Sequence, residues 1–280
     1  MRYVVTGAAG FIGSQLAETL AQAGNDVVGV DCFTDYYDAG EKEANARGLD
    51  VRRIDLADDA LELDGVDGVF HLAAQAGVRS FGDVFPLYVR QNLLATQRVF
   101  ESCARAGVRV VFASSSSVYG EAETYPTRED TPPSPISPYG ITKLGGEHLA
   151  RSYALAFGLD SVVLRYFTVY GPRQRPDMFF RRVCDALLDG DSFEIYGSGE
   201  QSRSFTEVGD VVDATIAAME RAPRGALYNV GGGDEASMLE SIALLERLSG
   251  RTLDVRHVGV ATGDVRRTKA DVTRIGEALG

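Results

Sequence analysis

The sequence has few of the residues that build metal or disulfide sites. Its 280 residues include three cysteines and three histidines. Cys32, Cys103 and Cys184 are odd in number and widely spaced, so we expect reduced side chains that mostly serve packing, as in a cytoplasmic protein. The histidines lack the spacing of metal ligands, and we predict no metal site.

Long hydrophobic runs and an excess of positive charge are also missing. No stretch of 18 apolar residues occurs, and residues 1–5 lead directly into a predicted strand, so we expect neither a membrane span nor a signal peptide. The formal net charge is −12, which argues against binding to nucleic acids or anionic membranes. An anionic ligand would therefore need local cations.

Short apolar runs alternate with stretches of helical periodicity in a chain of ordinary composition, 45% hydrophobic and 24% charged. The predicted strands are 2–6, 26–31, 51–54, 67–72, 108–114, 161–166 and 226–230. The predicted helices are 11–23, 40–47, 86–106, 139–157, 177–190, 208–221 and 237–249. This alternation predicts an α/β fold with a doubly wound parallel sheet.

A glycine-rich segment follows the first predicted strand. Gly7, Gly10 and Gly13 lie in the run 6–14 (TGAAGFIGS), just before and at the start of the helix 11–23. Strand, glycine turn and helix in this order are typical of a Rossmann dinucleotide-binding fingerprint, in which the pyrophosphate meets the helix N-terminus. The alternative is a flexible glycine-rich turn without a ligand.

Asp31 ends the second predicted strand. An acidic residue about 20 residues past the fingerprint binds the ribose hydroxyls of the cofactor. No lysine or arginine lies between Asp31 and Lys42, so a 2′-phosphate would meet a carboxylate without a sequence-local cation. We therefore predict NAD rather than NADP as cofactor. The alternative is an ordinary aspartate that caps the end of a strand.

Tyr139 and Lys143 lie four residues apart on a predicted helix and so share one face. A cation about 4 Å from a group contributes roughly 4 kcal/mol at an effective dielectric near 20. That energy would lower the pKa of a tyrosine from about 10 to near 7. We expect Lys143 and a positive nicotinamide ring to make Tyr139 a general base. The alternative is a chance pair on a solvated helix.

Four serines lie at the carboxyl end of the predicted strand 108–114. Ser114 is its last residue, and Ser115, Ser116 and Ser117 follow it. We call Ser114–Ser117 the serine strip. Ligands bind outside the carboxyl ends of strands in open α/β sheets, so these hydroxyls could hydrogen-bond a reacting sugar oxygen. A serine-rich turn without function is the alternative reading.

The chain resembles the extended short-chain dehydrogenases/reductases, a family of NAD-dependent epimerases and dehydratases that act on nucleotide sugars. The similarity is carried by segments 6–14, 71–79 (HLAAQAGVR), 114–120 (SSSSVYG), 139–143 (YGITK), 165–178 (RYFTVYGPRQRPDM) and, with changes, 199–214. It covers nearly the whole chain and is greatest to UDP-glucuronate 4-epimerases, because Thr168 stands where glucose epimerases usually have asparagine.

The resemblance implies a role for each matched position. It implies an NAD site formed by Gly7, Gly10, Phe11, Ile12, Asp31, Asp55, Leu56, Leu72, Ala73, Ala74, Gln75, Asn92, Ser114, Tyr139, Lys143 and Tyr166. It implies substrate contacts from Arg79, Ser117, Thr168, Arg175, Tyr196 and Arg203. The implied catalytic residues are Ser115, Ser116, Tyr139 and Lys143. The family also implies a UDP-sugar substrate and a homodimer.

The regular alternation weakens after residue 168, where Gly171, Pro172 and Pro176 interrupt it. We therefore expect an NAD-binding Rossmann domain of residues 1–167 and about 205–230. A smaller nucleotide-sugar-binding lobe would comprise residues 168–204 and 231–280.

Four positions depart from the family pattern: Cys32, Glu207, Gly209 and Ala261. Ala261 replaces an arginine that contacts the diphosphate in relatives, and Arg266 or Arg267 could take its place. The chain also ends earlier than most relatives, which leaves open whether a C-terminal segment is missing.

The expected substrate is UDP-glucuronate, epimerised at C4 to UDP-galacturonate. A carboxylate needs a cation in an acidic protein, and Arg173 and Arg175 follow Thr168 closely. Related dehydratases and decarboxylases carry acids at positions that hold Ser116 and Ser117 here, so epimerisation is favoured. UDP-glucose 4-epimerase, UDP-glucuronate decarboxylase and a non-catalytic NAD sensor remain as alternatives.

Overall fold

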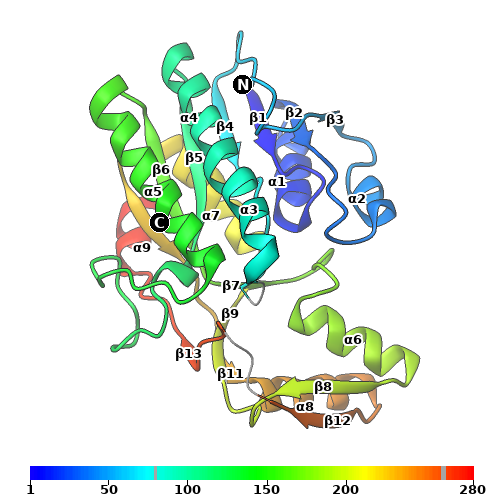
Figure 1. The fold of residues 1–280 in the computed structure, drawn as a ribbon. Helices are drawn as coiled ribbons and strands as arrows, with labels where there is room; N and C mark the ends of the chain where they lie inside the picture. The colour runs from blue at the N-terminus through cyan, green and yellow to red at the C-terminus, as the bar shows by residue number, and fades with distance from the viewer. Residues whose placement is uncertain (79–80, 260–262) are drawn as a thin grey trace.

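The computed structural model describes residues 1–78, 81–259 and 263–280 (Figure 1). Within these residues the core is a parallel sheet of seven strands in the order β10-β6-β5-β4-β1-β2-β3. Its strands are β1 (Arg2–Thr6), β2 (Asp26–Asp31), β3 (Asp50–Arg53), β4 (Gly68–His71), β5 (Arg109–Ser115), β6 (Ser161–Tyr166) and β10 (Leu227–Val230). They are the seven strands predicted from the apolar runs.

Helices cover both faces of this sheet, which confirms the doubly wound α/β fold. One face packs against α1 (Phe11–Gln22), α7 (Val208–Arg221) and α9 (Thr273–Leu279). The other packs against α4 (Ala95–Ala106) and α5 (Pro138–Phe157). The side chains of Val5 and Val4 belong to these two clusters respectively, so consecutive residues of a central strand are buried on opposite faces.

The predicted helix 86–106 is divided in the structure. It comprises α3 (Phe85–Tyr88), a π-helical segment η2 (Val89–Leu94) and α4, and the short 3-10 turn η1 (Gly82–Val84) precedes it. The remaining helix of this region is α2 (Ala39–Asn45). A second 3-10 turn, η3 (Ser116–Val118), follows β5 directly.

A smaller lobe lies beside the carboxyl ends of the central strands (Figure 1). One sheet joins β7 (Thr168–Tyr170), β9 (Ser202–Glu207), β11 (Glu235–Ser237) and β13 (Arg267–Thr268). The other pairs β8 (Ser192–Tyr196) with β12 (Asp254–Val258). Two helices, α6 (Phe179–Asp189) and α8 (Met238–Ser249), pack over their own apolar cluster, which includes Phe193 and Ile242.

The last helix does not belong with this lobe. Leu279 of α9 lies in the same apolar cluster as Tyr3 and Phe70 of the central sheet. We therefore place α9 with the Rossmann domain in the division proposed above, rather than with residues 231–280. No helix among the described residues is long and apolar enough to cross a membrane.

Candidate active site

A cleft of about 590 Å³ lies between the central sheet and the smaller lobe. The predicted site residues that line it are Gly7, Gly10, Phe11, Ile12, Asp31, Leu56, Leu72, Ala73, Ala74, Gln75, Ser114, Ser115, Ser116, Ser117, Tyr139, Lys143, Tyr166, Thr168, Arg175, Tyr196 and Arg203. Asp55 and Asn92 do not line it, and Arg79 lies outside the described residues. The fold thus brings residues from most of the chain to one surface.

The glycine turn between β1 and α1 has room only for glycine. Gly7 has φ +73°, and a Cβ there would lie 2.9 Å from the backbone nitrogen of Ala73. A Cβ on Gly13 would lie 2.2 Å from the carbonyl oxygen of Gly7. Gly10 is the N-cap of α1 and provides no side-chain cap, so the first N–H groups of the helix are left for an anion. The cradle fits a dinucleotide pyrophosphate.

Asp31 lies at the carboxyl end of β2 and anchors the adjoining turns. Its Oδ2 accepts a hydrogen bond from Ala9 N at 3.1 Å, and its Oδ1 accepts one from Phe33 N at 2.8 Å. Because the backbone fixes both oxygens, the carboxylate is held at the cleft wall, where the ribose hydroxyls of a dinucleotide would lie.

Lys42 is a cleft residue that the sequence analysis missed. Helix α2 brings it back beneath the loop that follows β2, where Nζ donates to the carbonyl oxygen and the hydroxyl of Thr34 at 2.6 and 2.9 Å. Burial lowers the pKa of Lys42, and Asp31 and Cys32 oppose this. Asp31 therefore has a cation nearby in space, although no cation lies close to it along the sequence.

Asp55 and Asn92 lie behind the cleft wall instead of on it. Asp55 accepts a hydrogen bond from Arg90 Nη1 at 2.7 Å; burial would raise its pKa, but this bond and others hold it below the usual value. Asn92 lies in the π-helical segment and exchanges hydrogen bonds with the backbone of Gln75, at 2.7 and 3.0 Å. Asn92 therefore positions a wall residue and has no surface on the cleft.

Tyr139 occupies the first turn of α5 and faces the serine strip. Ser137 caps this helix and accepts a hydrogen bond from Gly140 N at 3.1 Å. Burial raises the pKa of Tyr139, while the charge of Arg175 and a hydrogen bond with Ser115 lower it in part. Within the chain itself the net change is upward, which is opposite to the direction expected from Lys143.

Lys143 is turned toward the strand beneath Tyr139. Its Nζ donates to the carbonyl oxygen of Ala113 at 2.7 Å and lies 5.8 Å from the centre of the Tyr139 ring. Burial lowers the pKa of Lys143 to about 7, against the charge of Glu147. The lysine is therefore close enough to hold a ligand beside Tyr139, but its own charge is sensitive to pH.

The serine strip is ordered by its own hydrogen bonds. Ser115 Oγ donates to Ser117 Oγ and accepts from Ser117 N, both at 3.1 Å. Ser114 Oγ instead donates to Glu147 Oε1 at 2.5 Å. Ser115, Ser116 and Ser117 thus present hydroxyls to the cleft beside Tyr139. Positions 116 and 117 therefore offer hydroxyl groups here rather than the carboxylates expected in a dehydratase or decarboxylase.

The two arginines after Thr168 point in different directions. Arg175 lines the cleft, and its Nε and Nη2 donate to the carboxylate of Asp177 at 2.9 and 3.0 Å. Arg173 instead donates to Ser14 Oγ at 3.2 Å and to Glu18 Oε1 at 2.8 Å on α1. Arg175 is therefore the candidate for ligand contact, and Arg173 attaches the loop to the sheet domain.

Arg203 and Tyr196 lie in the wall formed by the smaller lobe. Arg203 is buried, and its Nη2 donates to Asp264 Oδ1 at 2.8 Å. Arg266 and Arg267 do not line the cleft, and Arg267 pairs with Glu235 at 2.6 Å. That either of them replaces the arginine absent at position 261 stays a prediction, since Ala261 lies outside the described residues.

Comparison with known proteins places the chain among sugar-nucleotide enzymes. A family model described as "NAD dependent epimerase/dehydratase family" matches residues 3–231. An uncharacterized UDP-glucose epimerase of Bacillus subtilis, YtcB, is 41% identical over 100% of this chain and 92% of its own. UDP-glucuronate 4-epimerase of Thermodesulfobacterium geofontis is 36% identical over 99% of this chain and 90% of its own.

A solved structure gives the same result in three dimensions. UDP-glucuronic acid 4-epimerase from Bacillus cereus, in complex with UDP-glucuronic acid and NAD, superimposes with a TM-score of 0.96 at 40% identity. The match covers 100% of this chain and 93% of that one. The similarity therefore includes the smaller lobe as well as the sheet domain.

Proposed function

This chain belongs to the NAD-dependent epimerase/dehydratase family, and from that premise we propose that it inverts C4 of UDP-glucuronate to give UDP-galacturonate. One observation carries the proposal: the Tyr139–Ser115 hydroxyl pair faces a cleft whose strip ends in Ser116 and Ser117 rather than in acids. Hydroxyls at those positions can hold the sugar but cannot act as the acid or base of an elimination.

The proposed reaction begins with the sugar's 4-hydroxyl between Ser115 and Tyr139. NAD, which the glycine turn, Asp31 and Lys143 would hold, would supply a reversible hydride acceptor at C4 and a positive ring that favours the Tyr139 phenolate. The Tyr139 phenolate takes the hydroxyl proton as the C4–H bond breaks, which leaves a 4-keto sugar. The sugar would then rotate about its diphosphate link, and Tyr139 would return the proton to the 4-oxygen as C4 is reduced on its opposite face.

The carboxylate of the substrate has a cationic partner in this geometry. Arg175 lines the cleft, and its charge acts on Tyr139, so it lies near the reacting end of the sugar. The 4-keto sugar is a β-keto acid, which loses carbon dioxide readily. Thr168 and Arg175 would hold the carboxylate in the plane that opposes cleavage of the carbon–carbon bond.

The test is a product analysis of the NAD-loaded protein by NMR with UDP-glucuronate, UDP-glucose and UDP-N-acetylglucosamine. We expect UDP-galacturonate to form fastest. Faster conversion of UDP-glucose would favour the activity in the name of the Bacillus subtilis relative. A pentose product would indicate decarboxylation, and no turnover of any sugar would favour an NAD sensor.

The cofactor preference provides a separate prediction. We expect the apoprotein to bind NAD at least ~10-fold more tightly than NADP, because a like-charge contact with Asp31 costs more than the ~1.4 kcal/mol that corresponds to tenfold. Calorimetry measures both affinities. Asp31→Asn should reduce the difference in affinity between NAD and NADP, since it removes the repulsion between the carboxylate and the 2′-phosphate. Tighter binding of NADP to the unaltered protein would contradict this role of Asp31.

We also propose a homodimer formed through the helices beside η2. Large apolar side chains are exposed there, among them Phe85, Leu87, Val89, Leu94 and Ile141, and such patches mark contact surfaces. Analytical ultracentrifugation should show a dimer that the double variant Leu94→Arg/Ile141→Arg converts to monomer. Leu248→Arg, an exposed leucine on α8, is the control and should stay dimeric. A monomeric unaltered protein would refute the proposal.

A further inference from the structure

A buried carboxylate lies directly behind the serine strip. Glu147 is on α5, one helical turn beyond Lys143. Its Oε1 accepts hydrogen bonds from Ser114 Oγ at 2.5 Å and from Arg165 Nε at 2.9 Å, and its Oε2 accepts from Arg165 Nη2 at 2.6 Å. The side chains of Glu147 and Arg165 are 7% and 4% exposed. The pair is therefore bidentate and almost completely removed from water.

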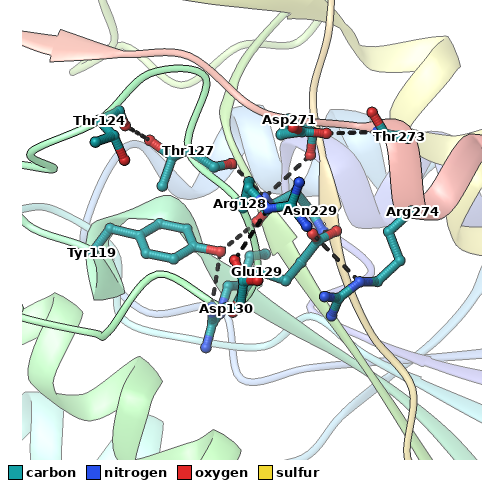
Figure 2. A network of polar contacts seen from close by, with 11 residues as sticks. Tyr119, Thr124, Thr127, Arg128, Glu129, Asp130, Asn229, Asp271, Thr273 and Arg274 are labelled. Carbon is teal, nitrogen blue, oxygen red and sulfur yellow. Dashed lines mark hydrogen bonds and ion pairs between the residues drawn. The ribbon is translucent and has the colours of Figure 1, made fainter.

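Arg165 is itself fixed from the other side. Its Nη1 donates to the Tyr119 hydroxyl at 2.8 Å and to the carbonyl oxygen of Glu129 at 3.2 Å. Figure 2 shows the continuation, in which the Tyr119 hydroxyl reaches Asn229 and Glu129 reaches Arg274. The guanidinium cannot turn without breaking these contacts, so it holds the Glu147 carboxylate in one orientation.

The same carboxylate acts on Lys143. The two residues are four apart on one helix, and the charge of Glu147 opposes the effect of burial on the lysine's pKa. Other titratable groups around Lys143 are Tyr139 on α5 and His71 on β4, and Arg165 on β6 pairs with Glu147. Burial, and to a smaller extent Lys143, lower the pKa of His71 to about 3, so this histidine is neutral at pH 7.

Apart from Arg165 of β6, the charged side chains on the elements packed against α5 are engaged elsewhere. Arg90 of η2 pairs with Asp55 and Asp58, and Arg98 of α4 donates to the carbonyl oxygen of Asp58. Arg105 and Glu101 of α4 pair with each other, and Arg109 of β5 donates to carbonyl oxygens of Met219 and Ala222. Glu147 is therefore the negative charge that acts on Lys143 from within the site.

We propose that Glu147 is a positioning residue for proton transfer: held by Arg165, it fixes Ser114 at the head of the serine strip and places a negative charge one helical turn from Lys143. The part that concerns turnover rests on the proposed epimerase function. The part that concerns the state of Lys143 does not. Two measurements separate them.

The first measurement titrates Lys143 directly. The chain contains three lysines, Lys42, Lys143 and Lys269, so NMR of protein labelled with ¹³C-lysine can follow each one in the NAD-loaded form. Glu147 is one helical turn from Lys143 and its charge favours the protonated lysine, so Glu147→Gln should lower the pKa of Lys143, by about 1 unit. Glu129→Gln is the matched control. It alters another buried carboxylate of this network and should leave Lys143 unchanged.

The second measurement is the pH profile of kcat. Lys143 loses its proton at lower pH in Glu147→Gln, so the alkaline decline of kcat should move down by the same amount. At pH values above the Lys143 pKa of both proteins, kcat of the variant should be lower by ~10-fold for each unit by which its Lys143 pKa has fallen. At pH values below both pKa values the loss of kcat should be smaller. A purely structural role would lower the whole profile without moving it along the pH axis.

Glu147→Gln leaves the buried charge of Arg165 unpaired, which can unfold a protein. The double variant Glu147→Gln/Arg165→Met removes both charges and so avoids an unpaired buried arginine. It should still show part of the lowering of the Lys143 pKa. An unchanged Lys143 pKa in either folded variant would overturn the proposal. If the unaltered protein turns over no UDP-sugar, the proposed function fails, and the lysine titration still decides the role of Glu147.

Discussion

Replacing Tyr139 with phenylalanine is expected to lower kcat by at least ~100-fold, the usual scale for loss of a general base. The change removes only a hydroxyl from a residue that lines the cleft and hydrogen-bonds with Ser115. The ring stays in place, so binding of NAD and UDP-sugar should remain close to that of the unaltered protein. Steady-state kinetics and calorimetry on the same preparations measure the two effects.

The control for this variant is Tyr153→Phe. Tyr153 lies on the same helix, and its hydroxyl accepts a hydrogen bond from Gln97 Nε2 at 2.5 Å, away from the cleft. Burial raises the pKa of Tyr139, so the active phenolate gains population as pH rises, and kcat should rise with it. That acid-side limb should disappear in Tyr139→Phe and persist in Tyr153→Phe. Turnover near that of the unaltered protein would exclude Tyr139 as the base.

The central sheet could be predicted from the sequence because most of its strands are buried on both faces. Strands such as β5 and β6 are therefore continuous apolar runs, with turn residues or helices between them. The strands of the smaller lobe could not be predicted in the same way, although its helices α6 and α8 were. Its strands β7, β11 and β13 are only three, three and two residues long, and β12 is largely exposed. Such segments carry no apolar pattern, and pairing with distant strands defines them.

The candidate site divides along a similar line. Residues at the ends of predicted strands and helices, such as Asp31, Ser115 and Tyr139, could be placed because parallel strands end at one edge of the sheet. Lys42 and Arg165 could not, because their roles come from contacts with residues far away or around a turn. Glu147 had a signal, its spacing of four from Lys143, but the spacing alone does not show that the carboxylate is buried.

The pKa of Tyr139 shows where local reasoning fails. Its spacing from Lys143 predicted a strong lowering, but the lysine donates to a backbone carbonyl and burial dominates at the tyrosine. Arg175, a residue 36 positions away in the sequence, is the group whose charge lowers that pKa. The spacing therefore pointed to Tyr139 as a candidate base, but the cation whose charge lowers the pKa of this tyrosine within the chain is Arg175 rather than Lys143.

Arg175→Ala is expected to reduce kcat/KM for UDP-glucuronate by roughly 10- to 100-fold more than for UDP-glucose. Hydrogen bonds to charged groups contribute about 1.5–3 kcal/mol, and ~1.4 kcal/mol corresponds to tenfold. Asp177 already engages Nε and Nη2 of this guanidinium. Among the described residues the structure gives Nη1 no hydrogen-bond partner, so this nitrogen can meet a substrate carboxylate while Asp177 holds the group in orientation.

The loss of Arg175 should also change the pKa of Tyr139, and this effect on kcat should be the same for both sugar substrates. Because the arginine's charge lowers the tyrosine's pKa, its removal raises that pKa and moves the acid-side limb of kcat to higher pH with either substrate. The ratio of the two kcat/KM values cancels this common effect and any general folding defect. The ratio is therefore the quantity that reports contact with the carboxylate.

Arg173→Ala is the matched control, since it removes the same side chain from the same loop but from a position that faces Ser14 and Glu18. It should leave the ratio unchanged. Loosening the carboxylate should also release the keto acid from the plane that protects it, so Arg175→Ala should form some 4-keto-pentose, detectable by NMR. Equal losses of kcat/KM for UDP-glucuronate and UDP-glucose, with no change in their ratio, would show that Arg175 does not contact the substrate carboxylate.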